Sequence, residues 1–92
     1  MNTPDLDRLD SAIAQIEGSS VATLDGSGGA RRLDQSPYQP SRDPNEALRL
    51  LDKYIARVVR LNDGWAAVAL SGRASSGPTL PIAVCIAVIE AQ

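Results

Sequence analysis

The sequence predicts an α+β fold, in which a helix–β-hairpin–helix core is followed by an apolar, strand-rich C-terminal tail. Apolar residues recur at helical spacing in two segments, a Gly-rich turn lies between those segments, and β-branched residues dominate the last apolar run. We expect residues 1–64 to form the core. We expect residues 65–92 to form a tail or hairpin that packs on the core or on a neighbouring subunit.

The first helix is predicted over residues 4–17. Thr3 is the expected N-cap, Pro4 suits the first helical position, and Gly18 is the expected terminator. The apolar stripe that faces the core recurs at i, i+3, i+7 and i+10: Leu6, Leu9, Ile13 and Ile16. The acidic side chains of this segment are expected on its solvated face: Asp5, Asp7 and Asp10.

A β-hairpin is predicted over residues 20–35, because the segment 25–29 between its two strands is a glycine-rich turn. A connection with two prolines follows over residues 36–43 and cannot be helical. This connection is interpreted either as a plain linker or as a recognition arm. As an arm, it would dock on a neighbouring protein with Tyr38 as its anchor.

The second helix is predicted over residues 43–61. Asp43 as N-cap and Glu46 three positions later form a capping box, with Pro44 at the first helical position. The apolar stripe repeats the spacing of the first helix: Leu48, Leu51, Ile55 and Val58.

The tail contains two apolar segments, residues 65–70 and 79–89, joined by a polar loop. Within residues 82–89, five of eight side chains are β-branched, which favours a strand over a helix. Both faces of such a strand are apolar, so the tail either completes a sheet of its own or adds to a neighbour. The residues expected at an intersubunit contact are Trp65, Ile82, Val84, Ile86 and Val88.

The composition excludes most kinds of site chemistry. The chain has 92 residues, no histidine and one cysteine. Without imidazole there is no histidine base or metal ligand, and Cys85 lies in an apolar run where burial keeps a thiol inert. The Gly-rich turn lacks the lysine of a phosphate-binding loop. We therefore expect no enzyme activity, no cofactor, no metal and no small-molecule substrate.

We expect neither a signal peptide nor a membrane span in this sequence. The first residues are polar and acidic, and the longest apolar run covers residues 82–89. A membrane-spanning helix needs roughly 20 apolar residues. We expect synthesis in the cytoplasm and no contact with a membrane.

Charge is unevenly distributed along the chain. Residues 1–25 hold one basic and five acidic side chains, whereas residues 26–60 hold seven basic and four acidic ones. These two regions can attract each other within one chain or between neighbouring copies. A basic stripe is predicted on the second helix: Arg49, Lys53, Arg57 and Arg60. The stripe either faces DNA or an acidic partner, or is a solvated surface.

The order of elements over residues 4–60 resembles the small head–tail joining proteins of tailed phages, of the lambda protein W type. The residues that carry the resemblance are Leu6-x-x-Leu9-x-x-x-Ile13-x-x-Ile16-Glu17-Gly18-x-x-Val21, then Asp25-Gly26, then Leu48-x-x-Leu51-x-x-x-Ile55. The connection 36–42 is longer than in that family, and residues 79–89 are more strand-like than its loose tail.

The resemblance implies a non-enzymatic structural protein of the virion. Such a protein forms an oligomeric ring between the DNA-filled head and the tail, so its partners would be other copies of itself, portal or tail proteins, and nearby DNA. The alternative from the basic stripe is a small nucleic-acid-binding regulator of the antitoxin or repressor type.

Overall fold

The computed structural model describes residues 5–24, 26 and 29–92. Within these residues it confirms a mixed α+β fold with three helices and two antiparallel sheets. The elements in chain order are α1 (Leu6–Glu17), β1 (Ala22–Leu24), β2 (Ala30–Arg32), α2 (Pro44–Tyr54), β3 (Ile55–Leu61), β4 (Gly64–Ala69), β5 (Ala74–Gly77) and α3 (Leu80–Glu90).

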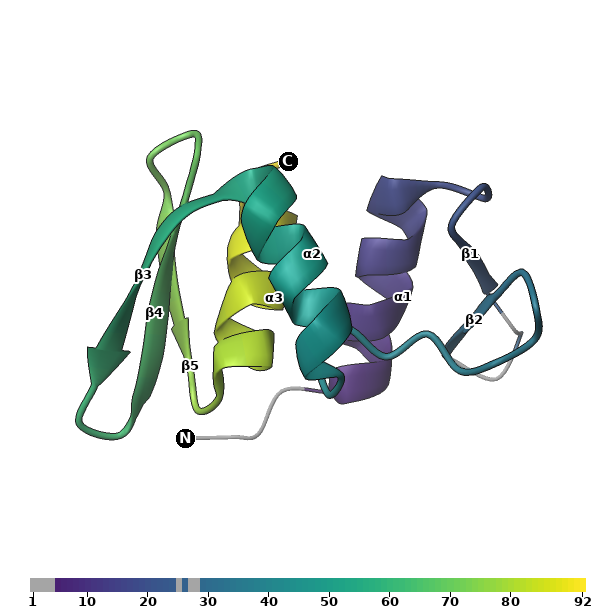
Figure 1. Ribbon diagram of the computed structural model, residues 1–92, viewed down its shortest axis with the longest axis horizontal. Helices are drawn as coiled ribbons and strands as arrows, with labels where there is room; N and C mark the ends of the chain where they lie inside the picture. The colour runs from purple at the N-terminus through teal and green to yellow at the C-terminus, as the bar shows by residue number, and fades with distance from the viewer. Residues whose placement is uncertain (1–4, 25, 27–28) are drawn as a thin grey trace.

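The elements form three layers along the longest axis of the molecule (Figure 1). The sheet β3–β4–β5 lies at one end, the helices form the middle layer, and the β1–β2 hairpin lies against α1 at the other end. Helix α3 contacts the sheet on one side and both α1 and α2 on the other. The helices therefore cover one face of the three-stranded sheet and leave its other face bare.

Helix α1 begins and ends close to the predicted positions. Its N-cap is Asp5, whose carboxylate accepts hydrogen bonds from the amides of Asp7 and Arg8 at 3.1 and 3.3 Å. The predicted cap Thr3 and Pro4 lie outside the described residues. Gly18 is the C-cap, as expected, and its φ of 91° is one that glycine adopts without strain.

The predicted hairpin is confirmed. Strands β1 and β2 pair antiparallel, with Thr23 opposite Arg31 at the centre of the pairing. Asp25, Ser27 and Gly28 of the predicted turn lie outside the described residues.

Helix α2 starts where the sequence predicts but ends much earlier. Asp43 is the N-cap and accepts a hydrogen bond from the Asn45 amide at 3.0 Å. The capping box is wrong in one half, because the amide of Asp43 donates to the Gln39 carbonyl while Glu46 binds Arg32. The helix ends at Tyr54, and the residues expected to extend it to residue 61 form strand β3 instead.

A β-bulge explains why β3 has helix-like apolar spacing. Ile55 pairs with Ala69 and Arg57 pairs with Val68, so Ala56 is an extra residue on β3. The bulge shifts the alternation by one position, and as a result Ile55 and Val58 both face the helices. A three-residue spacing that indicates one helix face is produced here by a strand.

The C-terminal apolar run is a helix, so the predicted strand over residues 82–89 is wrong. Thr79 caps α3 by accepting a hydrogen bond from the Ile82 amide at 3.3 Å, and a proline lies in the first turn. The helix carries apolar side chains on all of its faces because other elements enclose it on both sides. Burying each large side chain contributes about 1.5–3 kcal/mol, which exceeds the few tenths of a kcal/mol that a β-branched residue costs in a helix.

The buried side chains form one cluster that joins the two predicted regions. Ile13 of α1 and Leu50 of α2 come from residues 1–64, and Val84 and Val88 of α3 come from residues 65–92. The first apolar segment of the tail and part of the predicted loop supply β4 and β5, so the tail holds most of the larger sheet.

Candidate interaction surfaces

The predicted basic stripe does not exist as one helical surface. Arg49 and Lys53 lie on α2, whereas Arg57 and Arg60 lie on β3, on opposite faces of that strand. The ammonium group of Lys53 is 2.7 Å from the Glu17 carboxylate, which raises the pKa of Lys53 through this hydrogen bond. The four residues have helical spacing in the sequence, but α2 ends at Tyr54, before Arg57 and Arg60.

The residues expected at an intersubunit contact are mostly core residues of the same chain. Val84 and Val88 are buried in the core cluster with residues of α1, α2 and the sheet, and Ile82 is 5% exposed. Ile86 is half-buried, and half-buried Trp65 of β4 packs against the core. The apolar side chains of this tail are covered by the helices and the sheet of the same chain.

Tyr38 is an anchor, but it anchors the connection to its own chain. Its side chain is 2% exposed and belongs to the core cluster. Its amide donates to the Ala30 carbonyl of β2 at 3.0 Å. Burial raises the pKa of the Tyr38 hydroxyl far above its ordinary value. The structure thus overturns the docking arm, because the Tyr38 ring is not available to a neighbouring protein.

The acidic first helix pairs with the basic middle of the same chain. The Arg42 guanidinium lies 2.6 Å from the carboxylate of Asp10 and 2.8 Å from that of Asp7, and these bonds raise the pKa of Arg42. Asp10 also accepts a hydrogen bond from the Ser41 amide at 2.9 Å. Asp10 is 1% exposed, so its predicted place on the solvated face is wrong.

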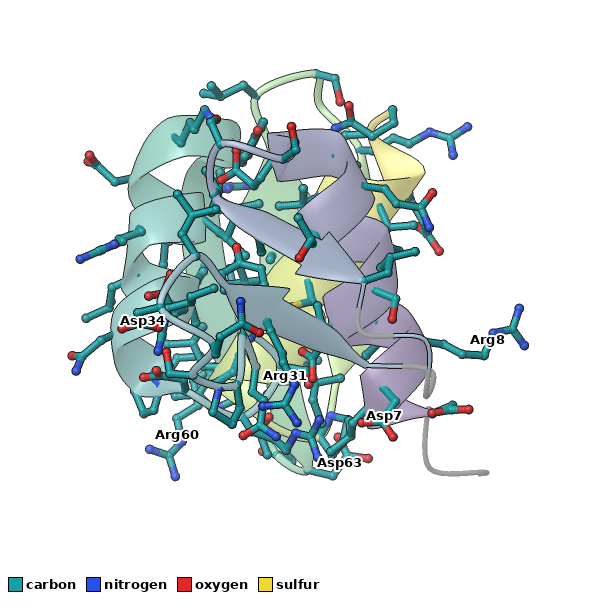
Figure 2. The ribbon with its side chains drawn as sticks, turned by 90° about the vertical axis from the view of Figure 1, so that its right-hand side faces the viewer. Asp7, Arg8, Arg31, Asp34, Arg60 and Asp63 are labelled. Carbon is teal, nitrogen blue, oxygen red and sulfur yellow. The ribbon has the colours of Figure 1, made fainter. Side chains whose placement is uncertain are left out.

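A polar cavity of about 140 Å³ lies beside this ion-pair cluster. Arg31 of β2 and Asp7 of α1 both line it, and Figure 2 labels both on the hairpin side of the molecule. Because Arg42 already binds two carboxylates, its charge is satisfied by the protein itself. The ion pairs of this cluster therefore hold α1 to the connection before α2.

A second ion-pair cluster joins the hairpin to α2. The Arg32 guanidinium is 2.9 Å from Glu46 and 3.2 Å from Asp43, and the hydrogen bond to Glu46 is the main cause of the raised pKa of Arg32. The carboxylate of Glu46 was expected to cap α2. Its position shows that the cap of α2 and the strand β2 are held together by one arginine.

The bare face of the three-stranded sheet is an apolar surface that no described element covers. Alternation and register place seven side chains on it: Arg57, Val59, Leu61, Ala66, Val68, Ala74 and Ser76. Val59 is 43% exposed and Leu61 is 40% exposed. We call this set the outer face. Arg57 is its one charged member.

Strand β3 is also a free sheet edge. It pairs with β4 on one side, and no described strand lies on its other side. Five of its seven residues are exposed, because α3 contacts β4 and β5 far more than β3. The β3–β4 turn extends away from the helices (Figure 1), and the Arg60 guanidinium lies 5.6 Å from the centre of the Trp65 ring.

An apolar groove of about 310 Å³ lies in the helical layer, between α2 and the start of α3. Its lining is Pro44, Ala47, Leu48, Leu51, Leu80 and Pro81. Leu48 is 55% exposed at its rim. The groove is thus a second apolar surface, distinct from the outer face.

Two kinds of site are absent from the described part of the chain. Among residues 5–24, 26 and 29–92, no group of three or more histidine, cysteine or acidic side chains is placed to hold a metal ion. In the same residues, no helix is long and apolar enough to cross a membrane.

Comparison of the chain with protein-family models, with curated proteins and with solved structures gives no match.

Proposed function

We propose that this protein is a non-enzymatic assembly protein that works as a homo-oligomer. The observation that carries the proposal is the outer face, where Val59 and Leu61 remain exposed beside Ala66 and Val68 on a sheet that is covered on one side only. Apolar sheet faces are normally covered by another layer. The covering layer in this proposal is a neighbouring copy.

The charge of the outer face favours a ring over a face-to-face dimer. A face-to-face dimer would place Arg57 among apolar side chains with no carboxylate opposite. A ring joins two different surfaces of each subunit, so the outer face can meet a surface that supplies a carboxylate.

The apolar groove is the second surface of the proposed ring. In this arrangement, Val59 and Leu61 of one copy pack against Leu48 and Leu51 of the next copy. Asp52 is exposed on the same helix as the groove and offers a carboxylate to Arg57. In the form that the resemblance implies, the ring is a head–tail connector in a phage virion, with portal and tail proteins above and below it.

Sedimentation velocity with two complementary variants tests the ring. Val59→Lys disrupts the outer face and Leu48→Lys disrupts the groove, so each variant alone should sediment as a monomer. An equimolar mixture retains one intact pair of surfaces and should form a dimer. An interface between like surfaces would give no new dimer on mixing. Leu33→Lys is the matched control, because Leu33 is 65% exposed and belongs to neither surface. A wild-type chain that remains monomeric at high concentration would refute the proposal.

A nucleic-acid-binding regulator is the second candidate. Arg57 and Arg60 are exposed and form no ion pair among the described residues, so both can meet phosphates. Its test is a DNA mobility shift that weakens with added salt and with Arg57→Ala or Arg60→Ala. A wild-type chain that causes no shift at low salt would dismiss it.

A further inference from the structure

We propose that the free edge of β3 binds an extended, acidic segment of a partner protein by strand addition. This site is the edge of the sheet rather than its outer face or the groove. It shares Arg57 and Val59 with the outer face but does not depend on the ring. A partner strand would lie beside β3 in the plane of the sheet and turn three strands into four.

The backbone of β3 supplies the first part of the site. β3 is an edge strand of seven residues, and the N–H and C=O groups that point away from β4 have no described strand to bind. Such an edge is a template for another extended chain. The edge at β5 is shorter, with four residues, and α3 packs closely on it.

The charges of β3 determine which chain fits. Arg57 is opposite Val68 and Arg60 is opposite Trp65, so the two guanidinium groups lie on opposite faces of one strand. Figure 2 shows Arg60 projecting clear of the ribbon. Neither arginine has a carboxylate partner among the described residues, and β3 itself contains no acidic residue. A strand with carboxylates opposite both arginines would complete two cross-strand ion pairs.

The same charges argue against a second copy as the added strand. Pairing β3 with β3 of another copy would bring four arginines together without a carboxylate. The β5 edge of another copy, Ala74–Gly77, carries no charge. Arginines on an edge strand repel unwanted neighbours, and they also select a strand of opposite charge.

The expected partner sequence follows from the spacing. Arg57 and Arg60 are three positions apart, so the partner carries two acidic residues three positions apart. A β-branched residue between them lies opposite Val59 on the outer face. The partner is thus an alternating, extended segment with two carboxylates, one on each face of the enlarged sheet.

A short synthetic peptide of valine and threonine with two glutamates three positions apart tests this site. Titration into the ¹⁵N-labelled full chain should shift the amide signals of β3. Replacing both glutamates by glutamine should weaken binding about fivefold, and N-methylation of alternate peptide amides should abolish it. Equal binding of the glutamine or N-methylated peptide would overturn the proposal, as would the absence of shifts in β3.

Variants of the protein locate the contact. Arg57→Gln and Arg60→Gln should each weaken binding about two- to fivefold, and both should retain the wild-type spectrum elsewhere because the two side chains are exposed. Arg8→Gln is the matched control, because Arg8 reaches into solvent from α1 (Figure 2) and should leave binding unchanged. A loss of affinity in Arg8→Gln equal to that in Arg57→Gln would mean that binding is a non-specific charge effect.

Discussion

Replacing Gly77 by alanine tests the packing of the sheet on α3. A Cβ atom at Gly77 would lie 2.9 Å from the backbone nitrogen of Ala83 and 2.9 Å from Cγ2 of Ile82. Both atoms belong to the first turns of α3, and the Ala83 Cα would be only 3.2 Å away. Because backbone atoms cannot rotate out of the way, either β5 or the start of α3 has to move.

The magnitude is the difference between two effects. Overpacking of this kind costs about 1–3 kcal/mol, whereas alanine gains about 0.4–1 kcal/mol over glycine by restricting the unfolded chain. We expect a net loss of about 1–2 kcal/mol in the free energy of unfolding. For a domain of this size, that corresponds to a fall in Tm of about 5–15 °C.

Thermal and urea unfolding followed by circular dichroism measure the loss. Ser76→Ala is the matched control, because Ser76 is the preceding residue of β5 and is exposed. Its midpoint should stay within about 0.5 kcal/mol of the wild type. If Gly77→Ala were as stable as the wild type, β5 would not pass this close to α3.

Three further predictions concern the buried groups. Asp10→Ala should lower the free energy of unfolding in urea by about 2 kcal/mol, because it leaves the Ser41 amide without its acceptor and removes one carboxylate from Arg42. Asp10→Asn should lower it less, because the side-chain oxygen of asparagine can still accept from Ser41. Burial raises the pKa of Cys85 to about 12, so native protein at pH 8 should resist a disulfide reagent and react only on unfolding; rapid labelling of the folded chain would contradict this. Val84→Ala should lower the free energy of unfolding by about 2 kcal/mol, independent of protein concentration, because this side chain packs within one chain; a loss that changes with concentration would instead place Val84 in an interface.

The sequence predicts those parts of the fold that depend on local signals. The cap at Asp43, the terminator Gly18 and the β1–β2 hairpin all follow from residues close together in the chain, and the structure confirms each of them. These signals act through backbone hydrogen bonds and φ preferences, which do not need the rest of the protein.

The end of α2 and the nature of α3 depend on long-range packing. Ile55 and Val58 have helical spacing because a bulge at Ala56 turns both toward the core, and no local rule marks that bulge. The β-branched run of α3 is helical because α1, α2 and the sheet enclose it. A segment apolar on all sides is typical of a central strand and of a buried helix alike, and Thr79 followed by Pro81 was the signal that favours the helix.

The internal ion pairs depend both on helical spacing and on the fold. Asp10 is four residues after Leu6 and three before Ile13, so it lies on the apolar stripe of α1 rather than on the opposite face. A carboxylate in that position needs a buried partner, and Arg42 is that partner. Helical geometry predicts the burial, but only the fold identifies the arginine.

The central place of α3 has a consequence for how the protein is made. The ribosome synthesises α3 after every element that it contacts, so α1, α2 and the sheet emerge before the helix that fills the space between them. Until α3 emerges, the inner face of the sheet and the stripes of both helices are open to water and to chaperones. The core is therefore expected to form only after α3 has emerged, at a rate that depends on contacts between distant parts of the chain.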